Sequence, residues 1–480
     1  RTSTVALRDF LEIPYEELEE RNLKAKAQRS DRVAAHKIQE DRLRDLADEK
    51  GVKAVTVCFT DLEGRLHMLD YDKKFLLKSY DNLTFDGSSI RGFSVVSESD
   101  LRLAIDWGSF RWLPSDVFGP GKVIVFGLIK DADGNSYKSD MRGVLKNYGA
   151  ELAKKGYVAN IAVECEGFLF EGHNAEQNFQ STKGFTLVSS GGYYNSLPND
   201  PLKLFIDRLA EAQRALAFEN EKDHPEVAPS QFELNYSYTE ALLAADQLQL
   251  YKLLARQVAA NMGYTASFLP KPIAGINGSG MHTNLSISQK GKNIFYDAKG
   301  EEKLSKFAWE FVDRLLNSAN DLCLLLNPSV NAYRRLDPHY EAPNQIKSSP
   351  VDRTSMVRIP LGNAKSARLE VRTVAPDANP YLAFYAILRT GFDGPMTETI
   401  TSETRRTRTK YLPGNVYDAL RLFKQSDFME KVLGAENKEK YIERKVAAAE
   451  RSPKELGTQV KTSEIVYHHE VTNQYIWGRF

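Results

Sequence analysis

A pair of carboxylates in an apolar segment constrains the fold of this chain more than any other feature. Residues 161–170 read IAVECEGFLF, and in an extended strand Glu164 and Glu166 point to the same face. Two adjacent negative charges in such a strand are unfavourable unless a cation neutralises them or their pKa rises. A divalent metal with oxygen ligands is a natural partner. The alternative is an edge strand whose glutamates face water.

The composition is typical of a globular protein and argues against several classes of function. The 480 residues exceed what one hydrophobic core usually organises, so we expect two domains or a large domain with an appendage. Lys+Arg and Asp+Glu both number 64, which gives no net charge to attract nucleic acid or an anionic membrane. No apolar run reaches the roughly 18 to 20 residues of a membrane span. The first residues are charged rather than apolar, so we expect a cytoplasmic protein.

The order of helix-like and strand-like segments predicts an α+β fold. Residues 14–50 contain no Gly or Pro after Pro14 and favour one long exposed helix that packs on its own domain or on a neighbour. A β-hairpin is predicted at 52–70 and a strand at 123–129, after which a helix opens a second domain. Three cysteines lie far apart in apolar segments and are expected to be buried free thiols: Cys58, Cys165 and Cys323.

Two further strands place charged side chains on one face. Glu233 lies on the polar side of SQFELNYSY, and Glu370 lies between Arg368 and Arg372 on the polar side of SARLEVRTV. Guanidinium groups suit bidentate binding of carboxylate and phosphate, and a glutamate suits a metal. The alternative is a salt-bridge ladder on the protein surface.

Other charged residues accompany these strands. Glu226 precedes the strand SQFELNYSY. His282 follows a glycine-rich loop, where its imidazole could supply a nitrogen ligand. Neither a GxxxxGK[ST] loop nor a GxGxxG after a strand occurs, so metals and arginines would have to hold any nucleotide phosphates. An anionic small substrate fits this mixture better than nucleic acid. Six arginines lie within 39 positions, with Glu341 among them: Arg334, Arg335, Arg353, Arg358, Arg368 and Arg372.

Six segments, taken together and in this order, resemble the signatures of the glutamine synthetases, in particular the bacterial and archaeal type I enzymes. The resemblance covers most of the chain, except the first fifty residues and, more loosely, the last eighty. The segments are FDGSSIRGF, VECEGFLF, EVAPSQFE, PKPIAGINGSGMH, NPSVNAYRRLDPHYEAP and ARLEVR.

The resemblance implies a small N-terminal β-grasp domain and a large catalytic domain whose antiparallel strands form a funnel flanked by helices. It also implies a homo-oligomer, a dodecamer of two hexameric rings, with active sites between neighbouring subunits. The expected division of the chain is a helical extension at 1–50, the β-grasp domain at 51–139 and the catalytic domain at 140–480.

The resemblance also implies roles for individual residues. Two Mg²⁺ or Mn²⁺ ions are expected, one on Glu166, Glu226 and Glu233 and the other on Glu164, His282 and Glu370. Substrate glutamate would meet Asn277, Gly278, Arg335 and Arg372. The nucleotide and the transferred phosphoryl group would meet Tyr238, Ser286, Arg353, Arg358, Lys365 and Arg368.

The implied reaction has two steps. ATP phosphorylates the γ-carboxylate of glutamate, and ammonia then displaces phosphate to give glutamine. Asp86 and Ser89, from the adjacent subunit, would bind ammonium and accept its proton, and Glu341 would close over the site and take a second proton. Two alternatives are a γ-glutamyl-polyamine or ethanolamine ligase of the same fold and a non-catalytic structural or sensor homologue. The intact Asp86-Gly87-Ser88-Ser89 segment favours ammonia, because the amine ligases commonly lose this aspartate.

Four residues depart from the family pattern. Gly167 replaces an aromatic residue, Phe232 a polar residue, Asn284 a histidine and Asp352 an asparagine. None of these departures removes an expected metal ligand or proton acceptor.

Overall fold

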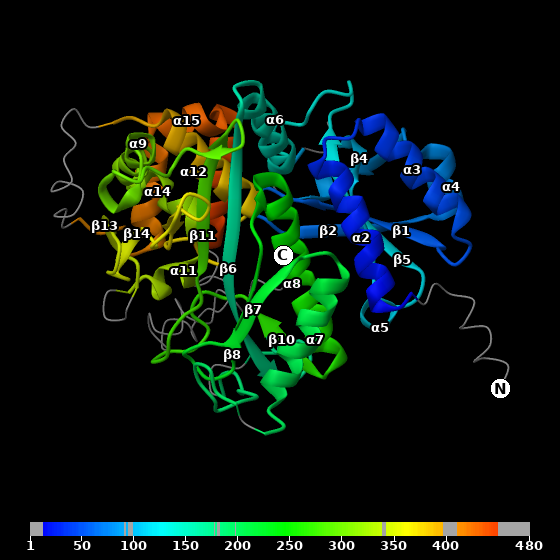
Figure 1. Ribbon diagram of the computed structural model, residues 1–480, viewed down its shortest axis with the longest axis horizontal. Helices are drawn as coiled ribbons and strands as arrows, with labels where there is room; N and C mark the ends of the chain where they lie inside the picture. The colour runs from blue at the N-terminus through cyan, green and yellow to red at the C-terminus, as the bar shows by residue number, and fades with distance from the viewer. Residues whose placement is uncertain are drawn as a thin grey trace.

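The chain forms two parts that share one continuous hydrophobic core (Figure 1). The computed structural model describes residues 13–90, 93–94, 99–176, 178–179, 183–196, 198–337, 342–396 and 410–449. The N-terminal elements gather on one side of the molecule, and the remaining elements surround the long strand β6 (Figure 1).

The N-terminal part contains a five-stranded sheet in the order β2-β1-β5-β4-β3. The β1 and β5 pair is parallel and the other pairs are antiparallel, which is the β-grasp arrangement expected from the resemblance. The hairpin predicted at 52–70 is confirmed as β1 and β2. The elements are β1 (Ala54–Thr60), β2 (Leu66–Asp72), α4 (Lys73–Ser79), β3 (Leu83–Asp86), η2 (Gly87–Ser89), β4 (Asp100–Trp112), α5 (Ser115–Phe118) and β5 (Lys122–Lys130).

The second part is built on a larger sheet in the order β13-β14-β15-β11-β6-β8-β7. Along this path only the β13 and β14 pair is parallel. Three short strands lie off this path: β9 and β10 pair with β6, and β12 pairs with β11. The strands are β6 (Tyr157–Glu171), β7 (Asn220–Pro225), β8 (Gln231–Tyr236), β9 (Thr239–Glu240), β10 (Tyr264–Ser267), β11 (Met281–Gln289), β12 (Lys292–Asn293), β13 (Gln345–Ser349), β14 (Ser355–Arg358) and β15 (Leu369–Val371).

Helices flank this sheet, and several begin at side-chain caps. The Asp200 carboxylate accepts a hydrogen bond from the Leu202 amide at the start of α7, and Pro201 takes the first helical position. The helix predicted from Lys303 to Leu326 is interrupted, since α9 ends before Ser318. The helices are α6 (Met141–Lys154), α7 (Pro201–Ala215), α8 (Ala241–Asn261), η4 (Glu301–Lys303), α9 (Lys306–Asn317), α10 (Ala319–Leu326), α11 (Val330–Arg335), α12 (Pro380–Asp393), α14 (Val416–Gln425), α15 (Asp427–Leu433) and helical residues 435–449.

The N-terminal extension forms two helices rather than the one long helix predicted. These helices are α2 (Tyr15–Ser30) and α3 (Ala35–Asp48), and Arg32 between them adopts a positive φ of 55° that no helix accommodates. Helix α2 is not exposed on all sides, because Leu18 and Ala25 are buried against the rest of the chain. The extension therefore packs on its own subunit.

Asn22 in α2 joins the two parts of the molecule. Its buried side-chain amide donates hydrogen bonds to the carbonyl oxygens of Trp112 in β4 (2.9 Å) and Ala215 in α7 (2.8 Å). Its oxygen accepts a hydrogen bond from the Trp112 amide (2.8 Å). All three bonds use backbone groups that need a partner when buried, so Asn22 fixes the β-grasp sheet to the catalytic part.

The fold class and the state of the cysteines agree with the predictions from the sequence. The α+β class with a β-grasp domain and a large catalytic domain is confirmed. Cys58, Cys165 and Cys323 are buried free thiols, as predicted. None of the helices in the described ranges combines the length and apolar character that a bilayer crossing requires.

Replacing Asn22 tests whether it holds the two parts together. Asn22→Ala leaves buried backbone groups without partners and is expected to cost about 1–3 kcal/mol. The melting temperature should fall by several degrees. The matched control is Asn317→Ala, which removes one exposed hydrogen bond, to the Pro395 carbonyl. Equal melting temperatures of the two variants would contradict the bridging role.

Candidate active site

Strand β6 presents its two glutamates to a cavity. From Ala159 to Gly167, the odd-numbered residues are buried and the even-numbered ones are half-buried, as the alternation predicts. Neighbouring strands bring further ligating groups to the same place. His282 in β11 lies directly opposite Glu164, and Glu233 in β8 lies directly opposite Glu166. Cross-strand register thus assembles the site.

The first cluster, the Glu164 group, consists of Glu164, His282 and Glu370, whose ligand atoms lie within 4.8 Å of one another. His282 Nδ1 is 3.4 Å from a carboxylate oxygen of Glu164 and 3.4 Å from one of Glu370. These are the three residues expected to hold one metal.

The second cluster, the Glu233 group, consists of His224, Glu226 and Glu233, again within 4.8 Å. His224 Nε2 is 3.2 Å from Glu233 and Nδ1 is 3.5 Å from Glu226. Glu166, which was expected to share a metal with these two glutamates, lies beside the cluster, and its carboxylate accepts a hydrogen bond from Gln231 at 3.1 Å. His224 was missed, although it stands two positions before Glu226 in HPEVAPSQFE.

Both alternatives that the sequence left open can be judged from the sheet order and from burial. Strand β6 lies between β11 and β8 rather than at an edge, and Glu164 and Glu166 are half-buried. Glu370, the carboxylate between the arginines, is 1% exposed. Arg358 and Arg372 do form ion pairs with Glu370, at 2.6 and 3.2 Å. The Glu370 carboxylate in these ion pairs is buried, so they do not form a salt-bridge ladder on the protein surface.

The electrostatics differ between the two clusters. Burial raises the pKa of Glu166 well above its usual range, and the charges of Glu233 and Glu226 raise it further. Burial and Glu233 also raise the pKa of Glu226. At Glu164 burial acts in the same direction, but the hydrogen bond and charge of His282 and the charges of Arg368 and Arg358 together outweigh it and bring the pKa to about 2. Ionisation of Glu166 and Glu226 is therefore unfavourable unless a cation binds beside them. This set of oxygen and imidazole donors fits Mg²⁺ or Mn²⁺.

A cavity of about 480 Å³ contains both clusters. Arg335 is fixed on its wall by hydrogen bonds to the carbonyl oxygens of Thr373 and Arg372, at 3.1 and 2.7 Å. Twelve of the predicted site residues line this cavity: Glu164, Glu166, Glu226, Glu233, Asn277, Gly278, His282, Arg335, Arg353, Arg358, Glu370 and Arg372. Lining residues that the sequence did not single out include Tyr193, Lys222, His224, Gln231 and Lys271.

The glycine-rich turn before β11 is needed for this packing. A Cβ atom at Gly280 would lie 2.8 Å from Arg335 Nη2 and 2.9 Å from His282 Nε2. A side chain at this position would displace an expected substrate contact and an expected metal ligand together.

A second cavity of about 720 Å³ adjoins the first. The two cavities share Glu164, Lys222 and Asn235 as lining residues. Four residues expected around the nucleotide line the second cavity: Tyr238, Ser286, Lys365 and Arg368. Asn284, which replaces a family histidine, accepts a hydrogen bond from Arg368 Nε at 3.2 Å.

The remaining predicted residues lie elsewhere. Asp86 and Ser89 belong to the β-grasp domain and line neither of these two cavities. The exposed Asp86 carboxylate accepts hydrogen bonds from the Ser88 hydroxyl (2.6 Å) and the Ser89 hydroxyl (2.8 Å), which lower its pKa. Glu341 lies outside the described residues.

Two departures from the family pattern, Gly167 and Phe232, compensate each other. They pair directly across β6 and β8. A Cβ atom at Gly167 would lie 2.7 Å from the Phe232 ring and 2.9 Å from the Phe268 ring. The phenyl ring therefore fills space that a larger residue at position 167 would occupy.

Comparisons with known proteins place the chain in a family. The model of the glutamine synthetase catalytic domain matches residues 138–462, and that of the glutamine synthetase β-grasp domain matches residues 51–129. The chain belongs to the glutamine synthetase family. The glutamine synthetase of Clostridium saccharobutylicum is 36% identical over 84% of this chain and 93% of its own length. That of Thermotoga maritima is 35% identical over 88% and 98%.

Solved structures agree with this assignment. A GmaS complex with ADP is 28% identical with a TM-score of 0.73, covering 87% of this chain and 99% of that one. The Plasmodium falciparum glutamine synthetase is 21% identical with a TM-score of 0.77, covering 90% and 98%, and supports the fold alone.

Removing one charge from the carboxylate cluster tests its affinity for metal. Glu166→Gln relieves repulsion, so the metal-free protein should melt at a higher temperature than wild type. Mn²⁺ should bind at least about tenfold more weakly in calorimetry, since a ligand or its immediate partner is lost. Glu211→Gln, on the exposed face of α7, should change neither value. Unaltered Mn²⁺ affinity in Glu166→Gln would contradict the expected cation site.

The Gly167 and Phe232 pair predicts a non-additive double mutant. Gly167→Ala should lower the free energy of unfolding by about 1–3 kcal/mol through overpacking. Adding Phe232→Leu should recover part of this loss, so the double variant should be more stable than the sum of the single effects. Thermal denaturation of all four proteins measures the coupling, and strict additivity would exclude the proposed compensation.

Proposed function

We propose that this chain catalyses the ATP-dependent ligation of ammonia to L-glutamate, giving L-glutamine, ADP and phosphate through γ-glutamyl phosphate. The observation that carries the proposal is the pair of adjoining cavities that meet at Glu164. One is lined by the residues expected around the nucleotide, and the other combines five glutamates with arginines. A phosphoryl donor in the first cavity can therefore reach an acceptor carboxylate in the second.

The two clusters supply the residues that would hold divalent cations. Glu164, His282 and Glu370 would bind one ion. Glu166, Glu226 and Glu233 would bind the other, with His224 beside them. Bound Mg²⁺ or Mn²⁺ would neutralise phosphate charge and orient the transferred group.

The arginines would act on the anionic reactants. Arg335 and Arg372 are suited to bind the substrate glutamate carboxylates, because planar guanidiniums form bidentate pairs. Arg353 and Arg358 would stabilise the negative charge on the transferred phosphoryl group. The product of this step is an acyl phosphate, an activated donor toward nitrogen.

The second step requires a proton acceptor, because ammonium is the main form in solution. Asp86 is suited to this role, since hydrogen bonds from Ser88 and Ser89 keep its carboxylate ionised. Glu341 remains a proposed second proton acceptor. Because Asp86 is exposed and lines neither cavity, the proposed active site forms between subunits of a ring. A dodecamer of two hexameric rings is the assembly we propose.

An amine ligase of the same fold is the second candidate function. Such a ligase would use the same nucleotide and glutamate cavities and differ only in the acceptor. The retained Asp86 and its two serine partners favour ammonia, because a small cationic acceptor needs a carboxylate to bind it and take its proton.

The choice of acceptor can be measured directly. Phosphate release is followed with ATP, Mg²⁺ and glutamate, with ammonium, putrescine or ethanolamine added in turn. Release with ammonium, together with formation of glutamine, supports the proposal. Turnover with an amine alone would establish the second candidate, and no release with any acceptor would favour a non-catalytic role.

Mixed oligomers test whether Asp86 acts on a neighbouring subunit. Asp86→Ala and Arg358→Ala homo-oligomers should each be nearly inactive. Co-expressed together, they should recover up to about a quarter of wild-type activity if subunits mix randomly in closed rings, because some sites combine two intact halves. As a control, two differently tagged copies of the same variant are co-expressed. Mixed oligomers as inactive as their parents would contradict a shared site.

A further inference from the structure

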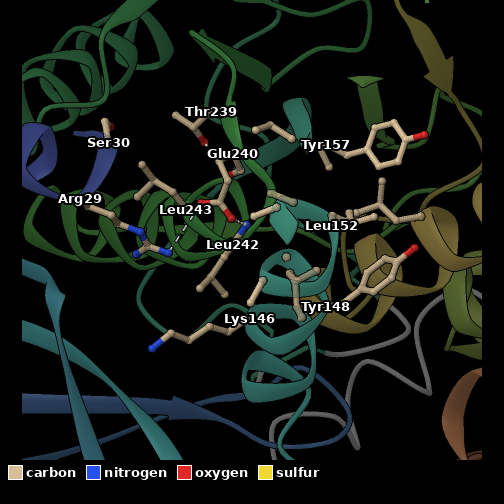
Figure 2. A pocket seen from close by; sticks show the side chains of 18 of the residues that line it. Arg29, Ser30, Lys146, Tyr148, Leu152, Tyr157, Thr239, Glu240, Leu242 and Leu243 are labelled. Atoms are coloured by element: carbon tan, nitrogen blue, oxygen red, sulfur yellow. Dashed lines mark hydrogen bonds and ion pairs between the residues drawn. The ribbon is translucent and has the colours of Figure 1, made fainter. Parts of the chain in front are cut away.

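A third cavity, of about 500 Å³, lies where the N-terminal extension meets the catalytic part. It is lined by residues of α2, α6, β6, β9 and the start of α8, and we call it the α2 pocket (Figure 2). The α2 residues precede both segments matched by the family models. One wall of this pocket is therefore supplied by the chain's own extension rather than by the family domains.

Positive charge predominates in the α2 pocket. Four basic residues line it, Lys26, Arg29, Arg32 and Lys146, against two glutamates. Lys26 is buried and is neutralised by Glu219 at 2.8 Å. Arg32 and Lys146 are exposed, and among the residues that the structure describes neither forms an ion pair.

Arg29 is the central basic group, and its partners leave part of it unsatisfied. It lies 3.8 Å from Glu240 and 3.6 Å from Asp246, both longer than a hydrogen bond. Its buried Nη1 atom is the one directed to Asp246, which does not line the pocket. Its Nη2 atom is directed to Glu240, which does line the pocket, but at 3.8 Å it makes no hydrogen bond with that carboxylate. A guanidinium nitrogen without an acceptor is unfavourable when it is shielded from water. An anion in the pocket would supply an acceptor for Nη2.

Glu240 shows which chemistry the pocket favours. Its carboxylate accepts a hydrogen bond from the Leu242 amide at the start of α8 (3.0 Å) and points toward Arg29 (Figure 2). A carboxylate is thus already held between a helix N-terminus and an arginine. The opposite side of the pocket is apolar, with Tyr148, Leu152 and Tyr157 (Figure 2).

We infer that the α2 pocket is a second ligand site, for a small carboxylate or phosphate that carries an aromatic or aliphatic group. The anionic end would lie on Arg29, with Arg32 and Lys146 at the rim, and the apolar end against the tyrosines and leucines. The size, the excess positive charge and the Nη2 atom of Arg29, which makes no hydrogen bond with Glu240, support this assignment independently of the reaction proposed above.

Calorimetric titration of the full chain with phenyl phosphate tests the inference. Arg29→Gln should weaken the binding by about tenfold or more, because a charge-assisted contact is lost. Glu240→Gln keeps an oxygen for the Leu242 amide but removes the competing charge, so it should bind the probe more tightly. Inorganic phosphate should bind more weakly than phenyl phosphate. Benzoate compares a carboxylate with a phosphate in the same site.

Two controls separate this site from the catalytic cavity. Arg358→Gln should remove any probe bound at the catalytic cavity and leave the α2 pocket intact. Arg44→Gln, an exposed substitution of the same kind in α3, should leave the affinity unchanged. Unaltered melting temperature would show that Arg29→Gln is folded. Equal affinity of Arg29→Gln and wild type for phenyl phosphate, or no binding at millimolar concentrations, would overturn the inference.

Discussion

Repulsion among buried carboxylates is the constraint on which this structure depends. Strand β6 carries Glu164 and Glu166 on one face, and antiparallel neighbours add Glu233 on one side and Glu370 beyond β11. Within the protein, His282 and the arginines compensate the Glu164 group, whereas burial and like charge raise the pKa of Glu166. The sheet tolerates this arrangement because its other face packs in a continuous core. A site of this kind is unfavourable by itself and becomes favourable when cations bind.

The N-terminal region has two consequences for the site. Through Asn22, helix α2 fixes the β-grasp sheet to α7 of the catalytic part. It thereby fixes the position of the β-grasp domain, which carries the exposed Asp86, relative to the catalytic part. The same helix forms one wall of the α2 pocket, whose lining includes Tyr238, a residue of the second cavity as well. The extension thus lies close to two regions of the molecule where ligands are expected.

Local patterns predicted much of this arrangement, and long-range pairing decided the rest. Alternation along β6 correctly indicated that Glu164 and Glu166 share a face, and the hairpin at β1 and β2 was visible in the sequence. His224 was missed because its place beside Glu233 arises from the register of β7 on β8. The break at Arg32 depends on how α2 and α3 pack on β4, which helix propensity alone does not reveal. The compensation between Gly167 and Phe232 likewise requires the register of two strands.

Anomalous diffraction from crystals grown with Mn²⁺ and ADP tests the central claim most directly. We expect two strong anomalous peaks per subunit. One should lie among Glu164, His282 and Glu370, and the other among Glu166, Glu226 and Glu233. Peaks at other positions, or none at either cluster at saturating Mn²⁺, would contradict the view that this carboxylate arrangement is a two-cation site.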